Sequence, residues 1–229
     1  MLNMLNVKSL AFMLAVCLAS AALPVEASLI SLWTFGPNAA GYTLNPTFDA
    51  TPGAALTVAG ANYDASGGNG VAFVDADGNS WTAGQSLHWS DVSSSSGDAS
   101  VHLSLDLTNW QDLQIRWDYK SDATGGKQGP VRLDFDYCLD GGTWVSVRNN
   151  EPLTKDDAWH PFGLDLSAIT DINGHANVAF RVNDIKEDPA AKDGDFWLDN
   201  IQLIGNYIPE PATLALLAFG GWAMLRRRP

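Results

Sequence analysis

The sequence predicts an all-β protein whose central part is an antiparallel β-sandwich with Greek-key connections. Hydrophobic and polar residues alternate with a period of two in several segments, which is typical of half-buried strands. No ten-residue stretch of this part shows the 3.6-residue period of the crossover helices that parallel sheets require. Turn signals recur about every ten residues, as in sandwiches with two packed sheets. We therefore expect two antiparallel sheets around one core.

The strands are predicted from this alternation and from the turns between them. The expected strands are Val101–Leu107, Leu113–Tyr119, Val131–Tyr137, Val178–Val182 and Phe196–Ile204. The third strand is followed by Asp140-Gly141-Gly142 and then by a short hydrophobic run, Trp144–Val147. Asp-Gly and Gly-Gly tolerate the positive φ angles of tight hairpin turns. We expect a β-hairpin there.

The first 27 residues have the features of a secretory signal peptide. One cation, Lys8, precedes the apolar stretch Leu10–Leu23, and the small residues of Val25-Glu26-Ala27 suit cleavage by signal peptidase after Ala27. Cys17 follows Val16 inside the apolar stretch, which argues against a lipoprotein. The sequence therefore predicts an exported protein.

The C-terminal residues 208–229 combine a proline motif, an apolar run and a basic cluster. Pro209, Glu210 and Pro211 precede the uncharged run Ala212–Leu225, and Arg226, Arg227 and Arg228 follow it. As a helix this run is about 21 Å long, less than the ~30 Å of bilayer hydrocarbon. Positive charge after an apolar helix favours a cytoplasmic end. We expect a transmembrane helix with the folded body outside.

This arrangement resembles the PEP-CTERM sorting signal of certain Gram-negative bacteria. The resemblance covers Ile208–Pro229 and implies that exosortase recognises and cuts the chain. It assigns the recognition motif to Pro209, Glu210 and Pro211 and the stop-transfer charges to the three arginines. It also implies transient anchoring in the inner membrane, then residence at the cell surface or in the extracellular matrix, with links to exopolysaccharide and biofilm.

Residues 28–207 remain as one strongly acidic domain. They contain 9 Lys and Arg against 24 Asp and Glu, a formal charge of −15. Such a body repels polyanions, which excludes nucleic-acid binding. Cys138 is its one cysteine, so no internal disulfide forms.

The last predicted strand contains a conflict in its alternation. Asp199 shares parity with Ile201, whereas Leu198 lies on the other face, so either Asp199 points inward or the strand bulges near Asn200. This run resembles the jelly-roll sandwiches of bacterial surface proteins and carbohydrate-binding modules. The resemblance implies a structural Ca²⁺ held by Asp193, Asp195 and Asp199. The alternative is that Asp199 accepts backbone N–H bonds and Asp193-Gly194 forms a turn.

A second acidic cluster, Asp75-Ala76-Asp77-Gly78-Asn79, has the spacing with which an EF-hand loop begins. Ser80 and Ser86 stand where that loop needs Gly and a bidentate Glu. We therefore expect an ordinary loop before Trp81.

Tryptophan residues are the candidates for sugar binding, because sugars stack their C–H faces on flat aromatic rings. Trp110 and Trp144 lie beside predicted turns, and Trp159 precedes His160-Pro161. Each is a candidate exposed platform, the alternative being a core position, as expected for Trp117.

No catalytic motif is recognisable in the sequence, and the four histidines show no metal-ligand spacing. His102 is expected to be solvated on the outer side of its strand. The sequence therefore predicts a non-enzymatic structural or adhesive component of an exopolysaccharide or biofilm matrix. The alternatives are a carbohydrate-binding module for exopolysaccharide and, third, an enzyme acting on polysaccharide.

Overall fold

The computed structural model describes residues 27–36, 44–51, 53–60, 63–64, 70–92, 99–123, 128–186 and 194–209. Within these ranges the chain forms strands and one short 3₁₀ helix, Thr170–Ile172. No helix of the described residues is long and apolar enough to cross a membrane. Residues 27–206 form one compact unit, which contains both hydrophobic clusters of the described residues.

Sheet A contains seven strands, and β14 is its central strand. Strand β14 lies between β9 and β1, while its first half pairs with β7 and its second half with β1. Strand β12 forms one edge and pairs with β9. The seven strands are β1 (Ser28–Trp33), β2 (Phe48–Asp49), β4 (Tyr63–Asp64), β7 (Leu87–Val92), β9 (Trp110–Ser121), β12 (Trp159–Asp165) and β14 (Gly194–Tyr207).

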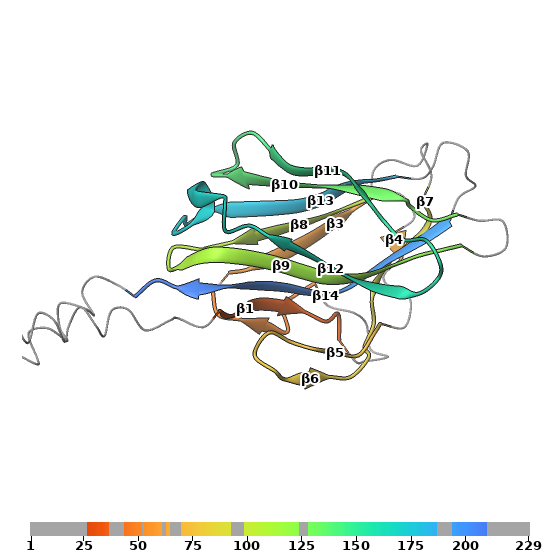
Figure 1. The fold of residues 1–229 in the computed structure, drawn as a ribbon, viewed down its shortest axis with the longest axis horizontal. Helices are drawn as coiled ribbons and strands as arrows, with labels where there is room; N and C mark the ends of the chain where they lie inside the picture. The colour runs from red at the N-terminus through yellow and green to blue at the C-terminus, as the bar shows by residue number, and fades with distance from the viewer. Residues whose placement is uncertain are drawn as a thin grey trace, which may run out of the picture. The chain divides into compact units, whose positions relative to one another are not determined.

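Sheet B contains five strands in the order β11-β10-β13-β8-β3, with antiparallel pairing throughout. These are β3 (Ala55–Ala59), β8 (Ala99–Leu105), β10 (Arg132–Leu139), β11 (Val145–Pro152) and β13 (Val178–Lys186). From β8 onward the chain passes between the sheets after almost every strand, and only β10 and β11 form a hairpin. Figure 1 shows the strands of both sheets running along the long axis. The predicted all-β sandwich is confirmed.

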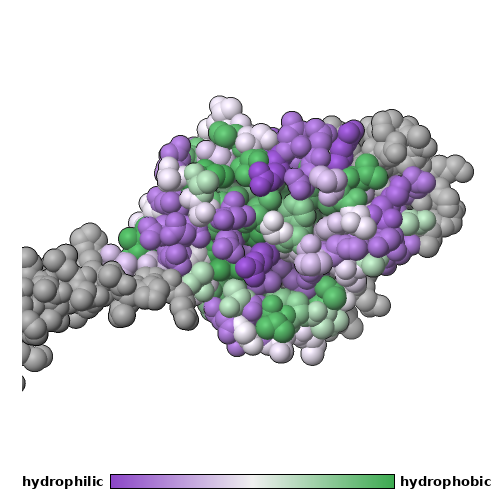
Figure 2. Space-filling model, in the orientation of Figure 1, coloured by the Kyte–Doolittle hydropathy of each residue, from purple (hydrophilic) through white to green (hydrophobic). Residues whose placement is uncertain are grey.

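The core lies between the sheets and is rich in aromatic rings. Trp117 of sheet A stacks on Phe135 of sheet B with ring centroids 5.9 Å apart, and Phe135 stacks on Phe180 at 5.8 Å. The alternating residues of the predicted strands supply the inward side chains, as expected. Hydrophilic residues interrupt the hydrophobic ones across the face of the body seen in Figure 2.

A small hairpin, β5 (Phe73–Val74) and β6 (Ser80–Trp81), covers part of the outer face of sheet A. It lies beside β1 in Figure 1, and its aromatic rings pack over a second apolar cluster of β1 and β14, made of Leu29, Leu32 and Ile204. In its loop, Asp75 accepts hydrogen bonds from Asn79 and from Trp81 Nε1 at 2.8 Å. The loop predicted before Trp81 is therefore confirmed, and its leading carboxylate is used to close it.

The conflict in the last strand is resolved by a left-handed residue. Asn200 has φ 52°, and Leu198 and Ile201 on either side of the Asp199-Asn200 pair both enter the main core. Asp199 consequently points to the outer face of sheet A. The alternation of β14 therefore breaks at Asn200, where the strand changes partner from β7 to β1.

Candidate functional site

A row of polar side chains crosses the outer face of sheet B. The pairing register places Thr57 beside His102, His102 beside Arg181, Arg181 beside Asp136 and Asp136 beside Ser146, one from each strand. Their sequence neighbours, such as Leu103 and Phe180, face the core, so the row faces outward. We call this row, together with Trp144, the sheet B site.

An ion pair occupies the centre of the sheet B site. Arg181 Nε and Nη2 both donate to Asp136 Oδ2, at 2.8 and 2.7 Å. The Asp136 side chain is only 8% exposed and that of Arg181 is 26% exposed. Two charge-assisted bonds to one oxygen hold the guanidinium plane in place, and the second carboxylate oxygen is left for other donors.

Trp144 lies over this ion pair. The Arg181 guanidinium carbon is 4.4 Å from the centre of the Trp144 ring, and the His102 ring meets it in a T-shaped contact at 5.5 Å. Among the described residues, no ring or cation covers the second face of the indole. A half-buried indole fixed by a cation beneath it is a rigid platform beside hydrogen-bonding groups.

The predicted hairpin turn positions Trp144. Asp140 and Gly141 have φ 52° and 68°, and Gly142 N–H donates to Leu139 O at 2.9 Å. Cys138 Sγ lies 3.4 Å from Gly142 O, which ties the turn to β10. Because both central residues are left-handed, the chain reverses within the turn and brings Trp144 back over the sheet.

His102 does not have the solvated position expected of it. It lies against Trp144 in the row, and burial and then the charge of Arg181 lower the pKa of its imidazole from 6.5. The ring is therefore neutral at pH 7 and offers one donor and one acceptor nitrogen. Alternation correctly placed His102 on the outer face, but its contact with Trp144 depends on a loop whose position the sequence does not reveal.

The other two tryptophan candidates differ from Trp144. Trp110 is 8% exposed and belongs to the core cluster, so the prediction of an exposed platform is wrong for this residue. Asp112, with φ 52°, interrupts the alternation of β9, so Trp110 faces the core together with Leu113. Trp159 is half-buried on β12, beside Lys120 of β9.

A second row of side chains lies on the outer face of sheet A and begins with Trp159 and Lys120. Lys120 Nζ lies 4.6 Å from the ring centre of Trp197, whose other neighbour, His88, stacks on it at 4.8 Å with ring planes 9° apart. His88 in turn lies 3.3 Å from Asp195. The faces of Trp197 are thus occupied by its own sheet.

Asp195 and Asp199, the two predicted calcium ligands among the described residues, do not lie at one site. Asp195 and Asp199 are four residues apart on one strand, about 13 Å between Cα atoms at ~3.3 Å per residue. Two such carboxylates cannot both approach one ion to the ~2.4 Å that Ca²⁺ requires. No group of three or more His, Cys, Asp or Glu within the described ranges is arranged to hold a metal. Asp193 lies outside those ranges, and calcium itself stays a prediction.

Asp199 accepts backbone hydrogen bonds, which was the alternative to calcium binding. Its oxygens accept from Val71 N at 2.9 Å and from Asn200 N at 2.8 Å, and its side chain is fully buried. Asn200 Nδ2 also donates to Asp118 Oδ2 at 2.8 Å. Burial raises the pKa of Asp199 to about 8, although the two backbone hydrogen bonds lower it, and the charge of Asp118 raises it further. Burial also raises the pKa of Asp118.

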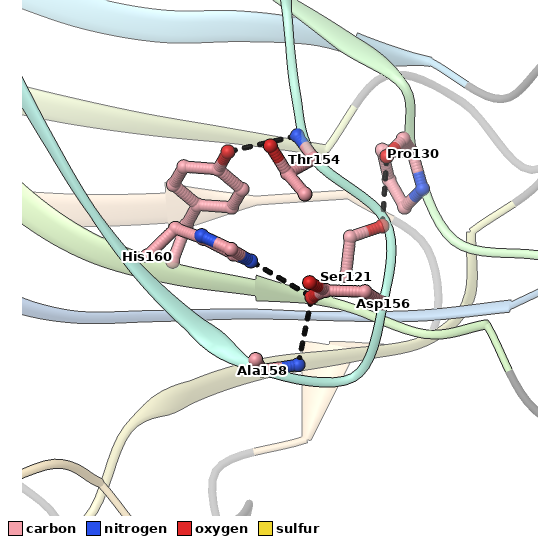
Figure 3. Close-up of polar contacts among 7 residues, drawn as sticks. Ser121, Pro130, Thr154, Asp156, Ala158 and His160 are labelled. Atoms are coloured by element: carbon pink, nitrogen blue, oxygen red, sulfur yellow. Dashed lines mark hydrogen bonds and ion pairs between the residues drawn. The ribbon is translucent and has the colours of Figure 1, made fainter.

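Ser121, Asp156 and His160 lie near one another at one end of the sandwich (Figure 3). His160 Nε2 is 2.8 Å from Asp156 Oδ1, but the Ser121 hydroxyl donates to Pro130 O at 2.7 Å. Ser121 is fully buried. A nucleophile must be hydrogen-bonded to its base and reach a substrate, and Ser121 has neither property. The Ser121–Pro130 bond instead holds the connection between β9 and β10, and the His160–Asp156 contact holds the connection between β11 and β12.

The residues of the sorting motif lie at the edge of the described part. Pro209 is exposed two residues after β14, while Glu210, Pro211, Arg226, Arg227 and Arg228 lie outside it. The family model of the PEP-CTERM protein-sorting motif matches residues 208–228. The chain therefore carries this motif, which implies export through the exosortase pathway to the cell surface.

Several solved structures that are similar to the chain are carbohydrate-binding modules. TmCBM61, solved with β-1,4-galactotriose, is 12% identical with a TM-score of 0.38, over 66% of this chain and 88% of that one. CBM35 from Paenibacillus barcinonensis is 13% identical with a TM-score of 0.33, over 65% and 96%. The CBM22 tandem domain of Xyn10C from the same organism is 15% identical with a TM-score of 0.40, over 83% and 48%. No curated protein matches the chain.

Proposed function

We propose that the exported body is a non-enzymatic adhesive component of an exopolysaccharide or biofilm matrix, and that it adheres by binding polysaccharide at the sheet B site. The observation that carries this proposal is the Trp144 platform over the Arg181–Asp136 pair. Sugar rings need an aromatic face for their C–H groups and paired donors and acceptors for their hydroxyls. The row supplies both on an outer face that crosses five strands.

The test is glycan binding by residues 28–207, which contain the whole core. Titration with soluble glycans should quench tryptophan fluorescence, and Trp144→Ala should weaken binding by about 30-fold, the ~2 kcal/mol typical of a central aromatic contact. Trp159→Ala, on the other sheet, is the matched control and should bind like the wild type. A purely structural role would be favoured if no glycan bound or if both variants behaved alike.

Sorting forms the second half of the proposal. The apolar run 212–225 holds the precursor in the inner membrane of a Gram-negative host until exosortase cuts near Pro209, Glu210 and Pro211. Support comes from the match to the sorting motif directly after β14. Mass spectrometry of the surface protein should show a chain without the terminal arginines, and their retention there would contradict the proposal.

A further inference from the structure

Charge compensation within the sheet B site indicates which glycans it accepts. Arg181 is the cation of the central row, and both of its bonding nitrogens are directed at Asp136. His102 adds no charge at pH 7, because burial and Arg181 hold its pKa below 6.5. Thr57 and Ser146 are neutral. The row as a whole has no net charge.

The cations nearest to the row are either distant or offset: Arg132 shares the outer face of β10 with Asp136 but lies four residues away, about 13 Å along the strand at ~3.3 Å per residue. At the β11 edge, Arg148 lies 3.8 Å from Glu151, so that charge is also offset. Two residue pairs along from the row, Asp134 of β10 pairs with Asn183 of β13. The whole body has a formal charge of −15, which repels polyanions over roughly a Debye length, about 8 Å at physiological salt.

We propose, building on the proposed function, that the sheet B site selects uncharged polysaccharides and rejects uronate-rich or sulfated ones, and that Asp136 sets this selectivity by occupying Arg181. An acidic sugar binds through a carboxylate or sulfate on a guanidinium. Here a protein carboxylate already takes that place. A neutral sugar needs no ion partner and uses the Trp144 ring, the free Asp136 oxygen and the imidazole.

The experiment compares neutral and acidic probes on residues 28–207. Laminarin, galactan and xylan serve as neutral glycans, and alginate and polygalacturonate as acidic ones, with affinity measured by fluorescence quenching and affinity electrophoresis. The wild type should bind a neutral glycan with less than about twofold change in Kd between 50 and 500 mM NaCl. Acidic glycans should bind at least about tenfold more weakly.

Asp136→Asn is the decisive variant, because it leaves Arg181 without its ion partner. Alginate binding should rise about tenfold or more, the effect of one charge-assisted bond, and should be lost at 500 mM NaCl. Asp165→Asn on sheet A makes the same change of net charge and should gain nothing. Circular dichroism shows whether each variant is folded, and if Asp136→Asn is not, the wild-type preference and its salt series decide alone.

The outcomes separate this inference from the function on which it rests. Wild-type protein that binds alginate as tightly as any neutral glycan overturns the selectivity and leaves glycan binding intact. A folded Asp136→Asn variant without a gain in alginate binding overturns the role of Asp136. If no probe of either class binds, the proposed function itself fails.

Discussion

The outer faces of the two sheets carry similar side chains and use them differently. On sheet A, Trp197 is enclosed between His88 and Lys120, and residues near Gly70 lie over the Asp199 carboxylate. On sheet B, Trp144 lies over one cation, Arg181, and the guanidinium of Arg181 also binds the Asp136 carboxylate. A tryptophan next to a cation and an acid is therefore not by itself a binding site. What distinguishes the two is whether the protein has already used both faces of the ring.

The largest expected difference between the faces is in their response to pH. Asp199 has no cation at hydrogen-bond distance among the described residues, and its pKa is raised from 3.8 to about 8. The folded state holds this proton at pH values where the unfolded chain has released it. The stability that this bound proton contributes is complete below about pH 4 and is lost as the pH rises to about 8. The free energy of unfolding changes by on the order of 5 kcal/mol over this range.

Urea denaturation at pH 5, 7 and 9 measures this effect. Asp199→Asn should be less stable at low pH, because its amide loses an acceptor, yet it should show a flatter dependence of unfolding free energy on pH. Gly163→Ala removes no titratable group and should keep the wild-type slope. Equal slopes for the wild type and Asp199→Asn would show that Asp199 does not hold the proton.

The next largest effect concerns the segment that closes sheet A. A Cβ atom at Gly70 would overlap the Asp199 carboxylate and lie 2.9 Å from Gln85 O. Gly70→Ala should therefore destabilise the body by about 3 kcal/mol, as overpacking does when backbone cannot yield. Gly163→Ala is the matched control, since its Cβ would lie at an ordinary 3.5 Å from Arg116 Cγ. Equal thermal midpoints for the two variants would mean that Gly70 is not tightly covered.

The smallest effect separates the two tryptophans directly. Trp197→Ala should lower the unfolding free energy by about 2 kcal/mol, because it empties the space between His88 and Lys120. Glycan affinity should not change. Trp144→Ala should do the reverse, with stability altered by less than about 1 kcal/mol and glycan affinity weakened by about 30-fold. If Trp197→Ala also weakened binding, the division of roles between the faces would be wrong.

The sequence predicts those parts of the fold that depend on local pattern. The alternation around Leu103, Ile115 and Phe135 is strict, and all three lie inside the sandwich. Strand β12 was not predicted, because Pro161 and Gly163 interrupt its pattern, and its edge position explains why a proline is tolerated there. The shortest strands, β2, β4, β5 and β6, have two residues each and leave no period to detect.

The candidate site was only partly predictable, for a related reason. Trp144 was a candidate because it follows a turn, but Trp110, which also lies beside a turn, enters the core. The partners of Trp144 depend on register between strands, which brings His102 and Arg181 side by side across about 80 residues of chain. Likewise, Asp195 and Asp199 are close in sequence, yet an extended backbone separates them.

The position of β14 has a consequence for the order of events in export. This strand ends at Tyr207, one residue before the sorting motif, and it is also the strand to which β1, β7 and β9 attach. Sheet A consequently cannot close until nearly the whole chain has been delivered. Pairing β1 with β14 joins residues 168 to 177 positions apart, a separation typical of slow folding. Secretion and folding are thus coupled in time, and the sorting motif follows directly on the segment that completes the sandwich.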